Sequence, residues 1–327
     1  MTYDLRMGMA TRDAYGKMLV EIGREDPNVV ALDADLSKST KTALFGKEFP
    51  GRFFNAGICE ANMVSMAAGL ASCGKIPFIS SFSVFLMNKG FDQLRMCVAY
   101  PGNNVKVIVS HGGISIGEDG PSQQSIEDIA LACSLPGFIV NVPADEVATR
   151  ALVRAAHAHR GPVFMRVGRP KTPIVYDEGE PFEFGKGKTL ITGDDLAIVT
   201  CGGLVAEAIR AADALERIHS LYATVIDMHT IKPLDIELLV SAAKRTRAVI
   251  VAEEALPDGG LCSAVARCLA EHCPTPIAFV ALPDAYAESG TPAQLLEKYG
   301  LNSKGIEAAA LRLAKRKASA CREQPVA

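Results

Sequence analysis

The sequence predicts an α/β protein made of two consecutive doubly wound domains with largely parallel sheets, and three observations support this fold class. Short runs rich in Val, Ile and Ala, bounded by Gly, Pro, Asn or Asp, alternate with segments of helical period. This alternation is interrupted once, over residues 171–194, and then resumes. A length of 327 residues, 49% of them hydrophobic, is also enough for two domains with substantial cores.

The first domain is expected over residues 1–170. Continuous apolar runs predict strands that are buried on both faces; these runs are Val29–Ala34, Ile76–Ser80, Val105–Ser110, Phe138–Pro143 and Val163–Val167. The segments with helical period are Thr11–Glu25, Ala61–Cys73, Phe85–Tyr100, Ser125–Cys133 and Asp145–His159. Asp145 is expected to cap the last of these helices, because a short carboxylate accepts hydrogen bonds from the first turn.

Residues 171–194 change in character, with several prolines and glycines close together, and they are predicted to be a linker. The second domain is expected over residues 195–327. Its predicted strands are Leu196–Thr200, Ala223–Asp227, Ala248–Ala252 and Ile277–Ala281, and its predicted helices are Val205–Ile218, Ile236–Thr246 and Leu261–His272.

Charge and cysteine content exclude several classes of function. The net charge is −3, from 34 basic and 37 acidic residues without a block of one sign, which excludes a nucleic-acid or anionic-membrane binder. Nine cysteines without a CxxC pair indicate reduced core thiols rather than a disulfide framework or a zinc site. We therefore expect no metal bound by this chain itself, no signal peptide or membrane span, and a cytoplasmic location.

Ligands of parallel sheets collect at the carboxyl ends of the strands, so the segments that follow the strands are the candidate sites. Asp33 and Asp35 begin a loop with several hydroxyls, although spacing alone favours a solvated turn with a helix cap. Glu60 opens a helix of small residues. A glutamate there usually serves the helix dipole, but its apolar neighbours indicate burial, and a buried carboxylate needs a partner or a function.

Two further segments follow later strands. The loop from Ser110 to Gln124 contains His111, two acids and four glycines, and this pattern favours a binding loop over a flexible surface loop. Arg166 and Arg169 close a strand, where they could capture a phosphate or carboxylate, or equally form surface salt bridges.

Three motifs together resemble those of the transketolase family. Gly57-Ile58-Cys59-Glu60 is similar to its Gly-Ile-x-Glu motif, and residues 111–124 are similar to its H-x-x-I-x-x-G-E-D-G-P-T-H-Q loop. Residues 283–290 are similar to the P-D-x-x-x-E-S-G of its C-terminal domain. The resemblance covers the pyrimidine-binding and C-terminal domains, and the G-D-G magnesium motif of the diphosphate-binding domain is not found. The chain therefore resembles the second subunit of a split transketolase.

The resemblance implies thiamin diphosphate as cofactor. Glu60 matches the catalytic glutamate that hydrogen-bonds a ring nitrogen of the aminopyrimidine, and the carboxylate thereby helps that ring to act as a base. The other residues at cofactor-binding positions of the family are Asp35, Ile58, Phe82, Phe85 and Asn88. Phe82 and Phe85 match an aromatic pocket for the pyrimidine, and Asn88 stands where transketolases often carry another aromatic residue.

The resemblance also implies a binding site for a sugar phosphate. Arg12, Ser39, His111 and Arg169 match positions that hold the substrate phosphate, and two guanidiniums, an imidazole and a hydroxyl suit an anion. His111 is also expected to take part in catalysis, and Asp119 matches the residue that contacts a substrate hydroxyl. Gln123 departs from the motif, which has histidine there.

The activity that the resemblance implies is the transfer of a two-carbon glycolaldehyde unit from a ketose phosphate, or a similar anionic ketose, to an aldose phosphate. The implied partner is an N-terminal diphosphate-binding subunit in an α2β2 heterotetramer, which would hold most of the diphosphate and Mg²⁺. One alternative is a beta-type subunit of a 2-oxoacid dehydrogenase or a relative of deoxyxylulose-phosphate synthase. Another is a non-catalytic nucleotide-binding or regulatory subunit.

Overall fold

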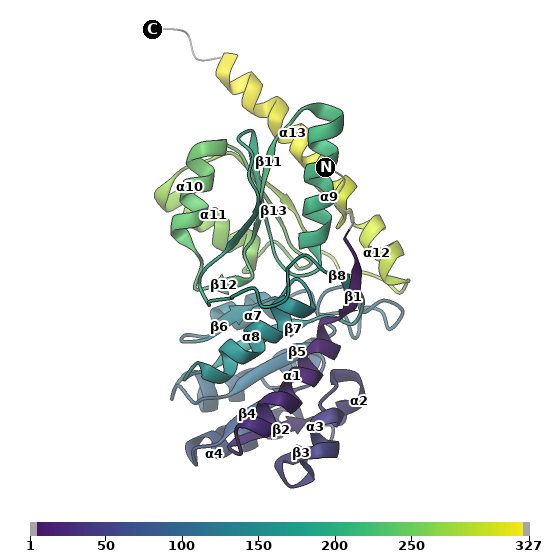
Figure 1. Ribbon diagram of the computed structural model, residues 1–327, viewed down its shortest axis with the longest axis vertical. Helices are drawn as coiled ribbons and strands as arrows, with labels where there is room; N and C mark the ends of the chain where they lie inside the picture. Colours follow the sequence, from purple (N-terminus) through teal and green to yellow (C-terminus); the bar gives the residue numbers. More distant parts are fainter. Residues whose placement is uncertain (1–4, 323–327) are drawn as a thin grey trace.

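The computed structural model describes residues 5–322 and confirms the α/β class with two sheets covered by helices (Figure 1). The first sheet has seven strands, of which six are parallel. In spatial order they are β12 (Thr230–Lys232), β6 (Ile139–Asn141), β7 (Val163–Val167), β5 (Lys106–Ser110), β4 (Ile76–Ser80), β2 (Val29–Asp33) and β3 (Phe53–Asn55). The antiparallel edge strand β12 comes from the second half of the chain.

Helices cover both faces of this first sheet because successive strand residues point to opposite sides. Val30 and Leu32 of β2 pack in one apolar cluster with α4 (Glu60–Ser72), α5 (Ser83–Lys89) and α7 (Asp128–Ser134). Val29 and Ala31 pack in a different cluster with α1 (Thr11–Glu25) and α8 (Glu146–Ala158). The Asp145 side chain caps α8 by accepting a hydrogen bond from the Ala148 amide at 2.8 Å, as predicted.

The second sheet follows the same rule. Its order is β14 (Ile277–Val280), β13 (Val249–Ala252), β10 (Leu196–Thr200), β11 (Ala223–Asp227) and β9 (Lys188–Ile191), with only β9 antiparallel. Leu196 and Ile198 face α9 (Leu204–His219) and α13 (Ser303–Arg322), whereas Ala197 and Val199 face α10 (Ile236–Thr246) and α11 (Leu261–His272).

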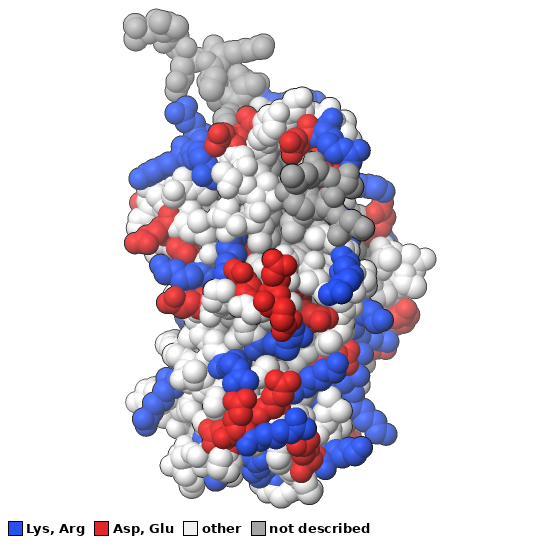
Figure 2. All heavy atoms as spheres, in the orientation of Figure 1, with Lys and Arg blue, Asp and Glu red and all other residues white. Residues whose placement is uncertain are grey.

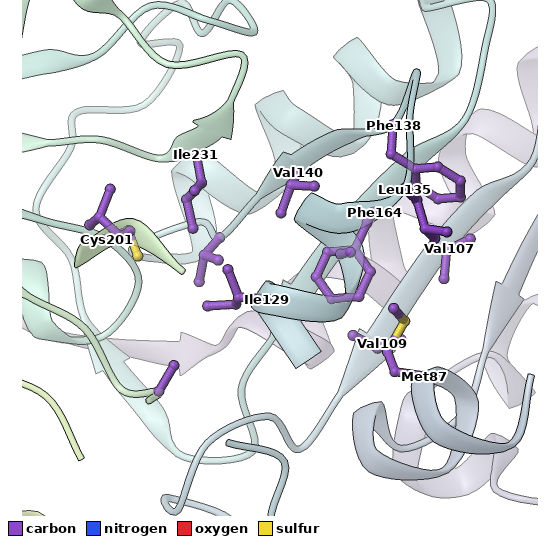
Figure 3. Packing of buried hydrophobic residues seen from close by; sticks show 14 of the residues in the cluster. Met87, Val107, Val109, Ile129, Leu135, Phe138, Val140, Phe164, Cys201 and Ile231 are labelled. Atoms are coloured by element: carbon purple, nitrogen blue, oxygen red, sulfur yellow. The ribbon is translucent and has the colours of Figure 1, made fainter. Parts of the chain in front are cut away.

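The two halves of the chain share one apolar cluster. Figure 3 shows Cys201 and Ile231 of the second half in the same cluster as Ile129 and Val140 of the first. The segment 171–194 adds to this connection, because β8 (Lys171–Pro173) pairs with β1 (Met7–Ala10) and β9 joins the second sheet. The domains are therefore packed firmly against each other rather than joined only by a tether.

One predicted helix is wrong. The segment Phe85–Tyr100 is divided into α5, α6 (Phe91–Gln93) and the π-helical turn η2 (Leu94–Ala99). The break falls at Gly90, where a side chain would come within 2.9 Å of the Leu86 carbonyl and 3.2 Å of Val64 on α4. Helix α4 therefore packs against the backbone itself at this point.

The sequence did not predict the shorter elements. These are β1, β3, β8, β9 and β12, together with α2 (Ser37–Thr40), α3 (Ala43–Glu48), η1 (Pro50–Arg52) and α12 (Pro292–Lys298). Each has seven residues or fewer, so it contains too few residues to show a period. The sequence also did not predict α13, which has 20 residues.

The sequence led to predictions about the distribution of surface charge and the burial of the cysteines, and the structure agrees with them only in part. Figure 2 draws one face of the molecule, and over the lower part of that face acidic and basic side chains are interleaved rather than gathered in one basic patch. The eight cysteines whose side chains the structure describes are free, and three of them, Cys201, Cys262 and Cys268, are buried. Cys59 and Cys73 are exposed, which corrects the prediction that the thiols all lie in the core. No helix in residues 5–322 combines the length and apolar character needed to cross a bilayer.

Candidate active site

The predicted site residues gather along the carboxyl edge of the first sheet. Asp33, Asn55 and Ser80 are register partners at the ends of β2, β3 and β4, and Ser110 ends β5 beside β7. Because the parallel strands all end at this edge, loops that are far apart in sequence meet there.

Glu60 is the first residue of α4 and is only 2% exposed. The preceding turn at Gly57 has a φ of +70°, a conformation that glycine adopts without strain. Ser81 Oγ donates a hydrogen bond of 3.2 Å to Glu60 Oε1, and Lys89 Nζ lies 3.9 Å from Oε2. The carboxylate is thus buried with one hydrogen bond and one distant cation, which leaves capacity for a further donor.

An aromatic wall stands beside this carboxylate. The rings of Phe82 and Phe85 lie 5.7 Å apart at an interplanar angle of 14°, and Phe82 also stacks on His111 with centroids 3.9 Å apart. Phe82 directly precedes α5, so both rings are fixed by the start of that helix. A flat heterocycle placed here would find apolar ring faces next to a carboxylate.

His111 is held as a neutral imidazole of one tautomer. Its Nε2 lies 3.0 Å from Arg12 Nη1, and a guanidinium can only donate, so Nε2 accepts. The proton is then on Nδ1, which donates to Ser110 Oγ at 2.7 Å. Burial, aided by the charges of Arg12, Arg169 and Lys41, lowers the His111 pKa to about 3. The ring therefore offers no positive charge at neutral pH, and the cations around it supply that charge.

The cations of the predicted phosphate site lie around His111. Arg12 Nη1 also donates to the Ser39 carbonyl at 3.1 Å, and its buried Nε has no hydrogen-bond partner among the described residues. Burial is the main cause that lowers the Arg12 pKa, and the charge of Arg169 contributes. Arg169 Nη1 donates to the Ile116 carbonyl at 2.7 Å and lies 3.4 Å from Asp119 Oδ2. This group, Arg12, Ser39, His111 and Arg169, is called the anion cradle below.

The other predicted residues make local contacts instead. Asp35 and Asn55 hydrogen-bond each other, and Asn88 Nδ2 donates to Glu127 Oε1 at 2.9 Å. Ile58 is 78% exposed at the turn before Glu60. Gln123 Oε1 accepts a hydrogen bond from the neighbouring Ser122 hydroxyl, so its side chain bonds locally rather than to the cradle.

The loop that carries His111 is held by the second domain. Ser115 N donates to Glu254 Oε1 at 2.6 Å, and Gln124 Nε2 donates to the Glu288 carbonyl at 3.0 Å. Glu288 belongs to the segment 283–290 that the sequence singled out. Arg166 is buried beneath the loop against Asp128 at 3.2 Å, so it forms neither a surface salt bridge nor part of the cradle.

A cavity of about 250 Å³ between the two domains lies next to the cradle rather than at the Glu60 carboxylate. Its lining includes Thr11, Gly112 and Gly168, the chain neighbours of three cradle residues, but neither Glu60 nor the aromatic wall. The open strand edge, where carboxylate, aromatic rings and cations meet, is therefore the candidate site. No cluster of three or more metal-ligating acidic, histidine or cysteine side chains occurs in the described part of the chain.

Sequence reasoning missed three residues at this site. Ser81 and Lys89 contact Glu60, and Lys41, paired with Asp13 at 3.0 Å, adds positive charge near His111. Lys89 lies four residues after Phe85, a spacing that places two helical residues on one face, and this signal could have identified it. Ser81 and Lys41 carried no comparable signal.

Comparison with known proteins identifies the family. The family model of the transketolase pyrimidine-binding domain matches residues 7–174, and that of the transketolase C-terminal domain matches residues 185–306. A Clostridium protein described as the 6-deoxy-6-sulfo-D-fructose transketolase subunit SqwH is 40% identical over 94% of this chain and 95% of its own length. A Phocaeicola vulgatus protein described as a subunit of apulose-4-phosphate transketolase is 36% identical over 94% of this chain and 98% of its own.

A solved structure described as a split gene transketolase, inactive beta4 tetramer, superposes with a TM-score of 0.88 at 48% identity. It covers 94% of this chain and 99% of its own. Both domains, the relatives over almost their full length and this structure agree with the motifs at residues 57–60, 111–124 and 283–290. The chain therefore belongs to the transketolase family, among the split-gene subunits that consist of the pyrimidine-binding and C-terminal domains.

Proposed function

We propose that this chain is the pyrimidine-binding subunit of a heteromeric transketolase that moves a glycolaldehyde unit from an anionic ketose to an aldose phosphate. The observation that carries the proposal is the meeting of two features at one strand edge. A buried carboxylate with an aromatic wall lies on one side, and a cradle of arginines lies on the other, with His111 in contact with both. A cofactor ring and a substrate anion would thus be held a short distance apart.

The residues of this chain fit the aminopyrimidine half of thiamin diphosphate, the cofactor of the transketolase family. When bound, that cofactor supplies the carbon nucleophile that cleaves the ketose. Glu60 would hold a proton shared with a ring nitrogen, because its carboxylate is buried and has unused acceptor capacity. Phe82 and Phe85 would fix the plane of the ring and exclude water from the shared proton.

The cradle would bind the anionic end of the sugar. The buried Arg12 Nε, which lacks a partner among the described residues, is a donor that an oxyanion could satisfy. His111 would contribute as a neutral hydrogen-bonding group, because its depressed pKa keeps it uncharged at neutral pH. Its stacking on Phe82 places it between the anion and the cofactor wall, which suits contact with the reacting end of the substrate.

A partner subunit would complete the site. Ile58 and Asn88 are exposed at the site, which leaves surface for another chain to cover. We propose that an N-terminal diphosphate-binding subunit supplies the diphosphate and Mg²⁺ sites in an α2β2 assembly. The solved relative, a tetramer of beta chains described as inactive, supports the need for such a partner.

The anion of the donor sugar is proposed to be phosphate or sulfonate. Guanidinium groups bind either tetrahedral oxyanion through parallel N–H donors. The name of the SqwH relative specifies a sulfonated ketose, and that of the Phocaeicola relative specifies a phosphorylated one. Gln123, where the family motif has histidine, marks this chain as a candidate for an atypical donor.

The test is reconstitution with a split-transketolase partner that carries the diphosphate-binding domain. The purified chain, the partner and their mixture are assayed with thiamin diphosphate, Mg²⁺ and glyceraldehyde 3-phosphate. The donors are xylulose 5-phosphate, 6-deoxy-6-sulfofructose or pyruvate. We expect aldehyde transfer only in the mixture and only from a ketose with a terminal anion. Turnover by the single chain would contradict the proposed assembly, and activity with pyruvate alone would favour the 2-oxoacid alternatives.

A further inference from the structure

Lys89 stands at the junction between the candidate catalytic carboxylate and the aromatic wall. It is the last residue of α5, four positions after Phe85, so the two side chains lie on the same face of the helix. Its ammonium nitrogen is 4.4 Å from the centroid of the Phe85 ring and 3.9 Å from Glu60 Oε2. The same side chain therefore contacts both groups that a bound aminopyrimidine would need.

Glu60 has few other polar contacts. Among the side chains described, Ser81 is the one that hydrogen-bonds to it, and Lys89 is the one cation within 4 Å. A carboxylate that is 2% exposed is costly unless a donor or an opposite charge compensates it. Lys89 supplies that charge in the free chain.

Lys89 is also free to leave. Its side chain is 53% exposed, and a lysine stem has four rotatable carbons that carry the ammonium into solvent at little cost. Asn88, the preceding residue, is anchored to Glu127 and to the Val84 carbonyl, so the end of α5 stays in place while the lysine moves.

We propose that Lys89 is a placeholder that pairs with Glu60 and covers Phe85 until the cofactor's pyrimidine replaces it at both contacts. This inference rests on the proposed function, since it requires that Glu60 and Phe85 bind that ring. The ring would take over the carboxylate through its own hydrogen bond and the Phe85 face through stacking. Lys89 is thus a positioning residue that keeps the empty site charge-compensated at the expense of cofactor affinity.

The direction of its effect on cofactor binding follows from this exchange. Removing the ammonium destabilises the empty site, because Glu60 loses its ion pair, but leaves the occupied site with its ring partner. It also removes a cation from the neighbourhood of a ring that shares a proton with Glu60. Both changes favour the occupied site, so loss of the charge should tighten binding of thiamin diphosphate.

The variants are tested in the complex with the diphosphate-binding partner. Lys89→Met keeps an apolar stem over Phe85 and removes the charge, so the dissociation constant for thiamin diphosphate should fall by about three- to tenfold. Lys89→Arg retains the charge and should stay close to wild type. Lys17→Met, which changes an exposed lysine on α1, is the matched control and should have no effect.

A double-mutant cycle with Glu60→Gln separates this role from a general effect on folding. With no carboxylate to compensate, Lys89→Met should change cofactor affinity much less in the Glu60→Gln background. Equal affinities of wild type and Lys89→Met, or an equal gain in both backgrounds, would overturn the placeholder role, and weaker binding by Lys89→Met would make Lys89 a cofactor ligand instead. If the wild-type complex binds no thiamin diphosphate, the proposed function itself fails, so the two failures are distinguishable.

Discussion

Glu60 is nearly fully buried, and its neighbours Ser81 and Lys89 leave one of its oxygens able to accept another hydrogen bond. Glu60→Gln keeps the size and a hydrogen-bonding group but cannot share a proton. Hydrogen–deuterium exchange at the thiazolium carbon of the cofactor, measured in the assembled complex, should slow by a factor on the order of 10² or more. Glu21→Gln, on the exposed face of α1, is the control. An unchanged exchange rate would remove Glu60 from the mechanism.

Arg169 is a cation of the cradle whose side chain is 37% exposed. Loss of a charge-assisted contact costs about 1.5–3 kcal/mol, and partial exposure favours the lower end. Arg169→Ala should therefore raise KM for an anionic sugar about tenfold and leave KM for an uncharged acceptor nearly unchanged. Arg24→Ala, which removes a surface arginine paired with Glu48, is the control. Equal effects on charged and uncharged sugars would show that Arg169 acts on folding instead.

His111 makes stability depend on pH because its folded pKa is about 3, compared with 6.5 for an unperturbed histidine. A depressed histidine pKa contributes stability that is fully present above pH 6.5 and lost as the pH falls, since the unfolded chain takes up the proton first. Between about pH 7.5 and 5.5, the unfolding free energy of wild type should fall by about 1.4 kcal/mol more than that of His111→Gln. Urea unfolding at both pH values measures this, and parallel losses would contradict it.

Among the structural elements, the loop of residues 111–124 is held by contacts with the second domain. Gly120 has a φ of +76°, and a Cβ there would meet the Ser289 hydroxyl of the second domain. Gly137 has the same φ with open space around it, so Gly137→Ala incurs only the backbone cost. Gly120→Ala should therefore reduce the unfolding free energy and the activity of the complex more than Gly137→Ala does.

The second step of this test is a rescue. Ser289→Ala removes the hydroxyl and leaves the nearest remaining atom at 3.5 Å, an ordinary contact. Combined with Gly120→Ala, it should return the loss to that of Gly137→Ala. No rescue would mean that the contact with the second domain does not hold this loop in place.

The sequence predicted the elements that are long or buried on both faces and missed those defined by partners. The five predicted strands of the first domain are all present, because each is a short run made mostly of apolar residues. Strand β12 has three residues and exists because β6 offers it an edge, which no local pattern reveals. Helix α5 ends at Lys89 because Gly90 packs against α4, a distant contact that helical period cannot show.

The site was predictable as a set of residues and only partly as a geometry. Motif resemblance indicated Glu60, His111 and Arg12, and the structure brings them to one strand edge. It could not indicate that Arg12 donates to His111 and thereby fixes its tautomer, because that contact joins residues 99 positions apart. The motif resemblance also assigned a phosphate-binding role to the Ser39 hydroxyl. In the free chain, it is the Ser39 carbonyl that accepts a hydrogen bond from Arg12.

At the scale of the whole molecule, the second domain supports the site without lying in it. Glu254 and Glu288 hold the His111 loop, and the apolar cluster shared by both domains fixes the two sheets relative to each other. The buried Glu60 carboxylate and the aromatic wall nevertheless lie beside exposed side chains such as Ile58. In the proposed heteromer, this chain would therefore supply half of an active site on a rigid support.

Calorimetric titration with thiamin diphosphate and Mg²⁺ tests this central claim most directly. The cofactor is added to the chain alone, to a diphosphate-binding partner alone and to their mixture, and NAD serves as a competitor for the nucleotide-binding alternative. We predict weak binding to each single chain and tight binding to the mixture, because in the proposed assembly different subunits would hold the ring and the diphosphate. Tight binding of thiamin diphosphate by the single chain, or binding of NAD by the mixture in its place, would contradict the account.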